Sequence, residues 1–181
     1  AGLSFLGATS ELPSTDSPFL VVDIGGGSTE FVMGERSVSA AISVDIGCVR
    51  MTERHFTSDP PTASQIASTR EDVNRAIDQV EDAVPIKSAK TLLAVAGTAT
   101  TVAASALGLP VYDRDAIHGA RISAERTLEI SAWLLTLTKQ ERAALGYMHP
   151  GRVEVIAAGA LVLAEIMKRS GAEEFIASER D

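Results

Sequence analysis

Residues 21–30 contain most of the side chains on which a chemical role for this chain would depend. The segment reads Val-Val-Asp-Ile-Gly-Gly-Gly-Ser-Thr-Glu, so two carboxylates, Asp23 and Glu30, flank three glycines and two hydroxyls. Glycines adopt positive φ easily and let backbone N–H groups approach an anion, which predicts a phosphate-binding turn. Carboxylate oxygens are ligands that Mg²⁺ prefers beside bound phosphate. We therefore expect phosphate chemistry, with Asp23 and Glu30 as metal ligands and Asp23 also as a residue that could orient water.

The glycine run does not have the form of the two common nucleotide-binding loops. A Walker loop closes with Lys-Ser/Thr, and a dinucleotide loop has the spacing G-x-G-x-x-G before a helix. Here residues 28–33 are rich in β-forming side chains, which predicts a second strand and a hairpin turn. Ser28, Glu30 and Val32 would share one face of that strand. A plain glycine-rich hairpin without a ligand is the alternative interpretation.

A second candidate anion site lies where a predicted strand meets a predicted helix, at Gly97 and Thr98. The free N–H groups of a helix N-terminus bind anions, although an ordinary helix cap explains the threonine equally well. Arg50, Arg54 and Arg152 are candidates for phosphate contact, but solvated charges or salt bridges are the commoner outcome. The candidate phosphate-binding residues are Gly25, Gly26, Gly27, Ser28, Thr29, Gly97 and Thr98.

Several segments together resemble one protein family. Residues 23–30 resemble the second phosphate-loop signature of the exopolyphosphatase / guanosine pentaphosphate phosphatase family, within the actin-like ATPase superfamily. Residues 47–54 resemble the family's segment after the third strand, and residues 96–101 resemble its next glycine-hydroxyl turn. Residues 149–152 and 157–160 resemble its C-terminal loop and helix. The resemblance extends nearly from end to end of the chain.

The resemblance implies Mg²⁺-dependent hydrolysis of terminal phosphoanhydride bonds in inorganic polyphosphate or guanosine pentaphosphate. It also implies an essential metal-binding or water-positioning carboxylate at Glu30. The family places its general-base glutamate and first phosphate loop upstream, so we expect residues 1–181 to be the second lobe of a two-lobed enzyme. Residues 1–18 would be the connection between lobes, and the isolated chain would be inactive. A homodimer of the complete protein is possible in principle. A nucleotide-binding lobe of an actin-like sugar kinase or chaperone-type ATPase is the alternative.

Composition limits the remaining classes of function. The 181 residues suit one domain with a sizeable core, and their net charge of −8 disfavours nucleic acid as a partner. No apolar run is long enough for a membrane span, and no leader pattern is visible, so we expect a cytoplasmic protein without a membrane partner. A single cysteine excludes an internal disulfide. The acidic balance suits a polyanionic substrate only if metal ions or another part of the protein supply positive charge.

The order of the predicted elements indicates an α/β fold. Apolar, β-branched or alternating runs predict strands at residues 19–24, 28–33 and 38–45, which would form an antiparallel three-strand meander. Strands at 91–96, 116–122 and 173–177 would alternate with helices. We expect a ribonuclease H-like domain with a mixed sheet and helices on both faces. The predicted helices cover residues 48–56, 63–84, 98–107, 124–136, 139–145 and 152–170.

Overall fold

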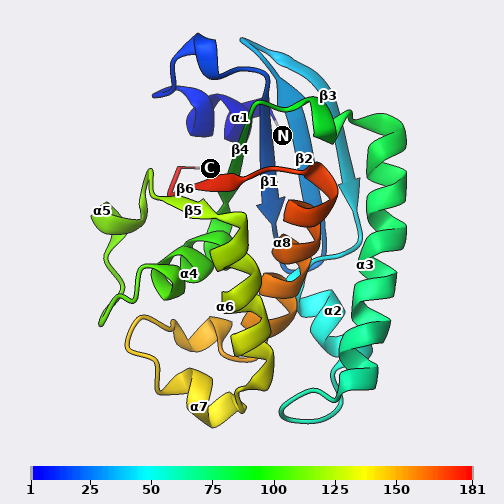
Figure 1. The fold of residues 1–181 in the computed structure, drawn as a ribbon, viewed down its shortest axis with the longest axis vertical. Helices are drawn as coiled ribbons and strands as arrows, with labels where there is room; N and C mark the ends of the chain where they lie inside the picture. Colours follow the sequence, from blue (N-terminus) through cyan, green and yellow to red (C-terminus); the bar gives the residue numbers. More distant parts are fainter. Residues whose placement is uncertain (1, 181) are drawn as a thin grey trace.

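A mixed β-sheet forms the centre of the molecule, which the computed structural model describes over residues 2–180 (Figure 1). Within these residues the strand order is β3-β2-β1-β4-β6-β5. The first three strands form the predicted antiparallel meander, β4 and β6 run parallel to β1, and β5 is an antiparallel edge strand. The strands are β1 (Phe19–Ile24), β2 (Thr29–Gly34), β3 (Val38–Val44), β4 (Thr91–Val95), β5 (Arg121–Ser123) and β6 (Glu174–Ser178). The predicted fold class is confirmed.

Helices cover both faces of the sheet, but unequally. The long helices lie on one face, with α8 between α3 and α6 in the view of Figure 1, and α1 (Gly2–Thr9) packs on the other. The helices on the first face are α2 (Cys48–His55), α3 (Ala63–Ala83), α4 (Ala96–Ala106), α5 (Arg114–Ile117), α6 (Ala124–Thr136), α7 (Lys139–Ala143) and α8 (Ile156–Ser170). Short 3₁₀ turns occur at η1 (Ser14–Asp16), η2 (Ile86–Ser88) and η3 (Pro150–Arg152). No helix within residues 2–180 is long and apolar enough to cross a bilayer.

Alternation along β1 divides the core in two. Leu20, Val22 and Ile24 point into the main core beneath the long helices. Phe19 and Val21 point the other way, into a smaller cluster with Phe5 of α1. Because both faces of β1 are covered, its sequence is an almost continuous apolar run and not a simple alternation.

Two predicted elements have the wrong bounds. The strand expected at 116–122 is a short helix, α5, followed by β5, because Asp113 accepts hydrogen bonds from two backbone amides and starts a helical turn. The helix expected at 152–170 begins only at Ile156, after the 3₁₀ turn η3. The predicted connection at 1–18 contains α1, while Ala1 lies outside the described residues. Its role between lobes stays a prediction.

The parallel arrangement brings the candidate residues to one edge of the sheet. The carboxyl ends of β1, β4 and β6 meet there, and the chain leaves β1 through residues 25–28 and enters α4 directly from β4. The loop from β3 into α2 lies at the same edge. Ligands in open α/β sheets bind outside the carboxyl ends of the strands, so this edge is the expected position for a site.

Candidate active site

The start of α2 holds the turn at residues 25–28, which we call the glycine turn. Cys48 N–H donates to the Gly25 carbonyl at 2.9 Å, and the N–H groups of Val49 and Arg50 both donate to the Gly26 carbonyl. The first amides of a helix have no partner within the helix. Here they are satisfied by the carbonyl groups of the glycine turn, which fixes the turn against α2.

This contact determines where the amides of the glycine turn point. The carbonyl of Gly27 also faces α2, accepting from Gly47 N–H at 3.1 Å and from Arg50 Nε at 2.7 Å. In a trans peptide the C=O and the following N–H point in opposite directions. The N–H groups of Gly26, Gly27 and Ser28 therefore point away from α2, as a concave anion site requires.

Close packing explains the glycines better than unusual dihedral angles do. None of Gly25, Gly26 and Gly27 has positive φ, so that part of the prediction is wrong. A Cβ on Gly47 would lie 2.3 Å from the Gly26 carbonyl oxygen, a contact that real side chains do not make. A Cβ on Gly26 would lie 3.3 Å from Val49 Cγ2. Small residues on both sides let α2 and the turn touch through their backbones.

Strand register pairs the two candidate carboxylates. Asp23 on β1 lies directly opposite Glu30 on β2, and both side chains are partly buried. Ser43 on β3 lies opposite Glu30, and Val95 on β4 lies beside Asp23. Directly paired residues share a face, so Ser43, Glu30 and Asp23 form a polar row that ends at the strand leading into α4. The sequence pattern did not identify Ser43, because cross-strand register depends on the turn geometry.

The turn from β4 into α4 has a strained backbone, and an arginine from a distant segment packs on it. Ala96 has φ 68°, a left-handed conformation that costs an alanine on the order of 1–2 kcal/mol. A Cβ on Gly97 would lie 2.2 Å from Arg152 Nη2, so the guanidinium group rests on the Gly97 backbone. Among the described side chains, no acidic partner forms an ion pair with Arg152. A cavity of about 480 Å³ opens beside these residues and is also lined by Tyr112 and His149.

The structure places Thr98 differently from the prediction. Its side chain is fully buried, and Oγ1 has no hydrogen-bond partner among the described residues. A Cβ on Gly159 of α8 would lie 2.7 Å from that oxygen, so the hydroxyl faces α8. Thr98 is also not the helix cap, because α4 begins at Ala96 without any side-chain cap. The Thr98 side chain therefore packs against Gly159 inside the helix layer.

Thr29 and the two arginines of α2 also differ from expectation. The Thr29 hydroxyl is buried and donates to the Ile46 carbonyl at 3.0 Å, so it braces the turn into α2 and is not available to donate to phosphate. Arg50 contacts the glycine turn and lies only 3.9 Å from Asp45, whereas Arg54 pairs with Asp72 on α3 at 2.7 Å. Of the arginines on α2, only Arg50 therefore lies at the candidate site.

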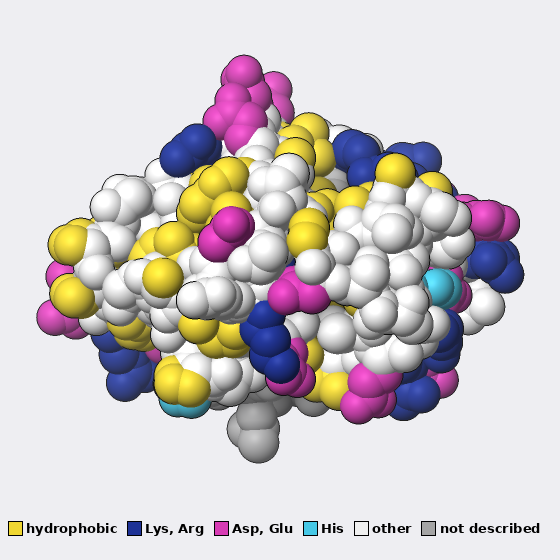
Figure 2. Space-filling view, turned by 90° about the horizontal axis from the view of Figure 1, so that it is seen from below, with side chains coloured by type: hydrophobic (Ala, Val, Ile, Leu, Met, Phe, Trp, Pro, Cys, Tyr) yellow, Lys and Arg dark blue, Asp and Glu magenta, His cyan; other side chains and the backbone are white. Residues whose placement is uncertain are grey.

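The donor set agrees with magnesium bound through phosphate and water. Residues 2–180 contain no group of three or more His, Cys, Asp or Glu side chains placed to hold a metal, which leaves the pair Asp23 and Glu30. Magnesium commonly uses one or two carboxylates and takes its other ligands from phosphate and water. Figure 2 shows this end of the molecule, where Lys and Arg side chains lie in separate groups interrupted by acidic and apolar ones. The basic side chains of the described residues therefore form no continuous track for a polyanion on this face.

Comparisons with known proteins agree on one family. The family model described as Ppx/GppA phosphatase family matches residues 1–180. Exopolyphosphatase 2 of Mycobacterium tuberculosis is 45% identical over the whole chain, which spans 58% of that relative. The crystal structure of an exopolyphosphatase-like protein matches with a TM-score of 0.95 at 41% identity, covering 98% of this chain and 61% of that one. An Aquifex aeolicus PPX-GPPA enzyme matches with a TM-score of 0.87 at 28% identity, covering 99% and 58%.

Proposed function

The chain belongs to the Ppx/GppA phosphatase family, and we propose that it supplies the phosphate- and metal-binding lobe of an enzyme that hydrolyses terminal phosphoanhydride bonds. Inorganic polyphosphate is the first candidate substrate and guanosine pentaphosphate the second. The exopolyphosphatase names of the relatives favour hydrolysis over the kinase-type alternative. The chain spans little more than half of those relatives, which supports a second lobe contributing to the same site.

One observation carries the proposal: the outward-facing amides of the glycine turn lie beside the cross-strand pair of Asp23 and Glu30. In the proposed reaction these amides donate to the oxygens of the terminal phosphoryl group. Catalysis of phosphoryl transfer is mainly a matter of positioning and charge stabilisation, and fixed backbone dipoles provide both. The contact with α2 keeps the dipoles oriented before substrate binds.

The two carboxylates would hold Mg²⁺, which when bound neutralises developing charge on the phosphate oxygens. Glu30 would also orient the attacking water through its second oxygen. The water oxygen forms a bond to the terminal phosphorus, and the bond to the bridging oxygen breaks. The shortened chain leaves with that oxygen, and the proton of the water passes to a base outside this lobe.

Arg50 and Arg152 would supply the positive charge that the acidic chain otherwise lacks. Arg50 is held on the glycine turn, and Arg152 is held on the start of α4. Guanidinium groups bind phosphate oxygens in a bidentate manner. Both arginines contact turns at the same edge of the sheet as the acid pair, so they would contact the phosphates next to the one that is removed.

Substitution of the acid pair tests the proposal in the longer enzyme that carries this lobe. We expect Glu30→Gln and Asp23→Asn to reduce phosphate release from polyphosphate by about 10³-fold, the scale of losing a group that stabilises the transition state. Glu35→Gln is the control, because Glu35 is exposed and follows Gly34 at the opposite end of β2. Binding of Mn²⁺ to the 181-residue chain, measured by electron paramagnetic resonance, should weaken in the same two variants. Full activity in Glu30→Gln would overturn the proposal.

The same assay decides the substrate and the role of the lobe. Release from guanosine pentaphosphate but not polyphosphate would replace the first candidate with the second. We expect the 181-residue chain alone to release no phosphate, because half of a two-lobed site cannot enclose the substrate or supply the base. Robust hydrolysis by that chain would contradict the two-lobed arrangement.

A further inference from the structure

Arg142 is the one arginine whose side chain lies almost fully inside the described part of the molecule. It belongs to α7, and the residue is 5% exposed. Its Nε donates to the Val153 carbonyl at 2.8 Å, and its Nη1 donates to the Leu137 carbonyl at 2.7 Å. Both acceptors are backbone groups from segments on either side of α7. The side chain therefore connects the end of α6 with the residues that precede α8.

Retaining a guanidinium group in this position has a cost that ordinary packing would avoid. Burial lowers the pKa of Arg142, and the carboxylates of Asp59 and Glu154 act in the opposite direction. The nearest of them, Asp59 Oδ1, lies 3.8 Å from Nη2, and the Asp59 carboxylate also accepts from Lys139 N–H. A methionine would fill similar volume without the desolvation cost. The contacts with two carbonyl groups are thus the specific feature of this arginine.

The segment that Arg142 holds is the one that carries Arg152. Val153 directly follows Arg152, so the acceptor carbonyl belongs to the residue next to the one whose guanidinium group rests on Gly97. The segment is itself tightly turned, since Arg152 N–H donates to the His149 carbonyl at 2.8 Å and Val155 N–H donates to the Arg152 carbonyl at 3.1 Å. A turn of this kind moves as a unit, so a displaced Val153 carbonyl displaces Arg152.

We propose that Arg142 is a positioning residue, which places the Arg152 guanidinium on Gly97 at the edge of the sheet where the glycine turn lies. The inference rests on the proposed function only in assigning Arg152 to substrate. Arg142 itself faces the interior and contacts no substrate. It acts by fixing the backbone between α7 and α8, in addition to the short turns of that segment and its buried side chains Tyr147, Met148 and Val153.

The test is a double-mutant cycle in the longer enzyme with polyphosphate as substrate. We expect Arg142→Met to raise KM about tenfold with a smaller change in kcat, because a misplaced cation weakens binding before it affects the reaction. In an Arg152→Met background the same substitution should change KM less than twofold, since the group that it positions is already absent. Independent effects in the cycle would overturn the proposal.

Two further variants separate positioning from general destabilisation. Arg142→Lys keeps the charge but not the planar fork, so it should raise KM to an intermediate degree and serves as the test if Arg142→Met does not fold. Arg169→Met removes another well-bonded arginine, on α8 far from Gly97, and should lower the melting temperature without changing KM. An equal rise of KM in Arg169→Met would show that loss of stability alone explains the effect.

A structural measurement keeps the inference separate from the proposed function. In the 181-residue chain, the ¹H–¹⁵N resonance of Gly97 should shift in Arg142→Met and in Arg152→Met, but not in Arg169→Met. That result would support the positioning role even if the longer enzyme hydrolysed no phosphoanhydride. An unchanged Gly97 resonance in a folded Arg142→Met chain would refute the positioning role whatever the activity.

Discussion

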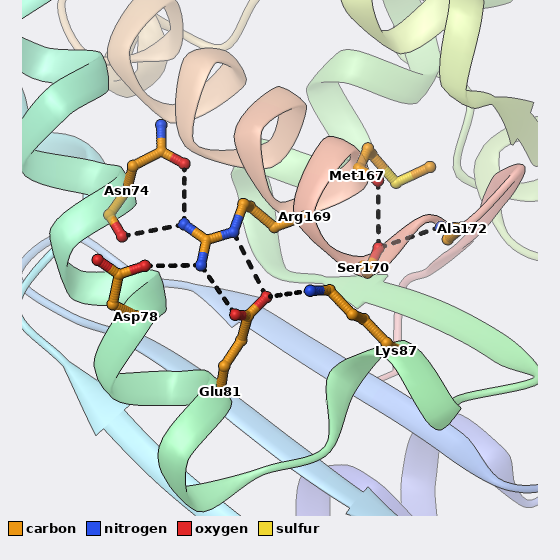
Figure 3. A network of polar contacts seen from close by, with 8 residues as sticks. All are labelled: Asn74, Asp78, Glu81, Lys87, Met167, Arg169, Ser170 and Ala172. Atoms are coloured by element: carbon orange, nitrogen blue, oxygen red, sulfur yellow. Dashed lines mark hydrogen bonds and ion pairs between the residues drawn. The ribbon is translucent and has the colours of Figure 1, made fainter.

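Two regions of the molecule use arginine in opposite ways. Between α3 and α8, the Arg169 guanidinium donates to Asp78 at 2.7 Å, to Glu81 at 2.9 Å and to Asn74 at 3.2 Å (Figure 3). At the glycine turn, Arg50 donates to a backbone carbonyl, and its Nη2 lies 3.9 Å from Asp45 Oδ1. Arg169 therefore forms close ion pairs in the contact between α3 and α8, which we call the α3–α8 seam. Among the described side chains, Arg50 at the sheet edge has no ion pair as short as these.

The acids of the two regions are arranged differently. Glu165 on α8 has a side chain that is 4% exposed, and it accepts from Arg70, Asn74 and Lys168 at 2.9–3.0 Å. These contacts lower its pKa despite the opposing effect of burial. Asp23 and Glu30 instead lie directly opposite one another on β1 and β2, so their side chains share one face of the sheet at its edge.

The two regions satisfy their hydrogen-bonding groups in different ways. At the α3–α8 seam, side chains satisfy one another and hold two helices together. At the glycine turn, backbone carbonyls satisfy the amides of α2, and the amides of the turn point the other way. The contact between α3 and α8 is therefore made by side chains, whereas the proposed site is held in place by backbone groups. The four predictions below test that division.

Gly47→Ala should have the largest effect on the site. The new Cβ would meet the backbone of Gly26 at 2.3–2.4 Å, so α2 must move away and lose its bonds to the glycine turn. We expect a loss of about 3 kcal/mol in unfolding free energy, at the upper end of overpacking costs. We also expect at least about a 100-fold loss of kcat/KM in the longer enzyme, the scale of losing one fixed donor. Thermal unfolding and phosphate release measure the two effects.

Gly108→Ala is the matched control for Gly47→Ala. Gly108 has φ 64°, so alanine there is strained, but no atom lies within 4 Å of the added Cβ. The expected cost is about 1 kcal/mol in stability with unchanged activity. If the two variants lost activity in proportion to stability, the contact between α2 and the glycine turn would have no special role in the site.

Glu165→Ala should affect the seam and spare the site. Removing the carboxylate leaves Arg70, Lys168 and Asn74 without their shared acceptor, although the two cations are about half exposed and can regain water. We expect a loss of about 2 kcal/mol in stability, below the range for a fully buried pair. The activity per folded molecule should stay within twofold of the wild type. A large fall in kcat below the melting transition would show that the two regions are coupled.

Lowering the pH should weaken the contacts of Glu165 between α3 and α8 before it affects the apolar core. The folded-state pKa of Glu165 is lowered from its ordinary value of about 4.5, mainly by the hydrogen bonds from Asn74 and Lys168 acting against burial. A lowered pKa stabilises the fold above the unfolded-state value, and that contribution is lost as the pH falls through the folded-state value. Denaturant midpoints should therefore fall below about pH 4.5, and less steeply in Glu165→Gln. Parallel curves for the two proteins would assign the acid loss to other groups.

The sequence predicted the fold through signals that act locally. The β-branched run at 19–24 and the apolar spacing over 63–84 both lie where the structure has β1 and α3. The glycine turn was found from composition, and the register pairing of Asp23 with Glu30 follows from the short hairpin. Helix α1 was not predicted, because eight residues with little polar contrast give no helical periodicity.

The missed parts of the site depend on contacts between distant segments. Nothing in the local sequence shows that Arg152 reaches Gly97, 55 positions earlier, since the contact depends on how α7 turns the chain before α8. The burial of the Thr98 hydroxyl likewise depends on Gly159. The same holds for the buried Glu165 between α3 and α8, because its place among apolar residues of α8 is explained by its contacts with Arg70 and Asn74 of α3.

Ala96→Gly should have the smallest effect and the opposite sign. Ala96 has positive φ at the turn from β4 into α4, and glycine adopts that conformation without the steric cost of a Cβ. Relief of about 1–2 kcal/mol of strain is partly offset by the larger entropy of glycine in the unfolded chain, which leaves a net gain of about 0.5–1 kcal/mol. Ala106→Gly in the same helix has no such strain to relieve and should lose up to about 1 kcal/mol.

A loss of activity in the stabilised Ala96→Gly protein would mean that the strained backbone orients the start of α4 for its ligand, as strain often does at binding sites. Unchanged activity would mean that the contact of Arg152 with Gly97 is sufficient to hold that turn.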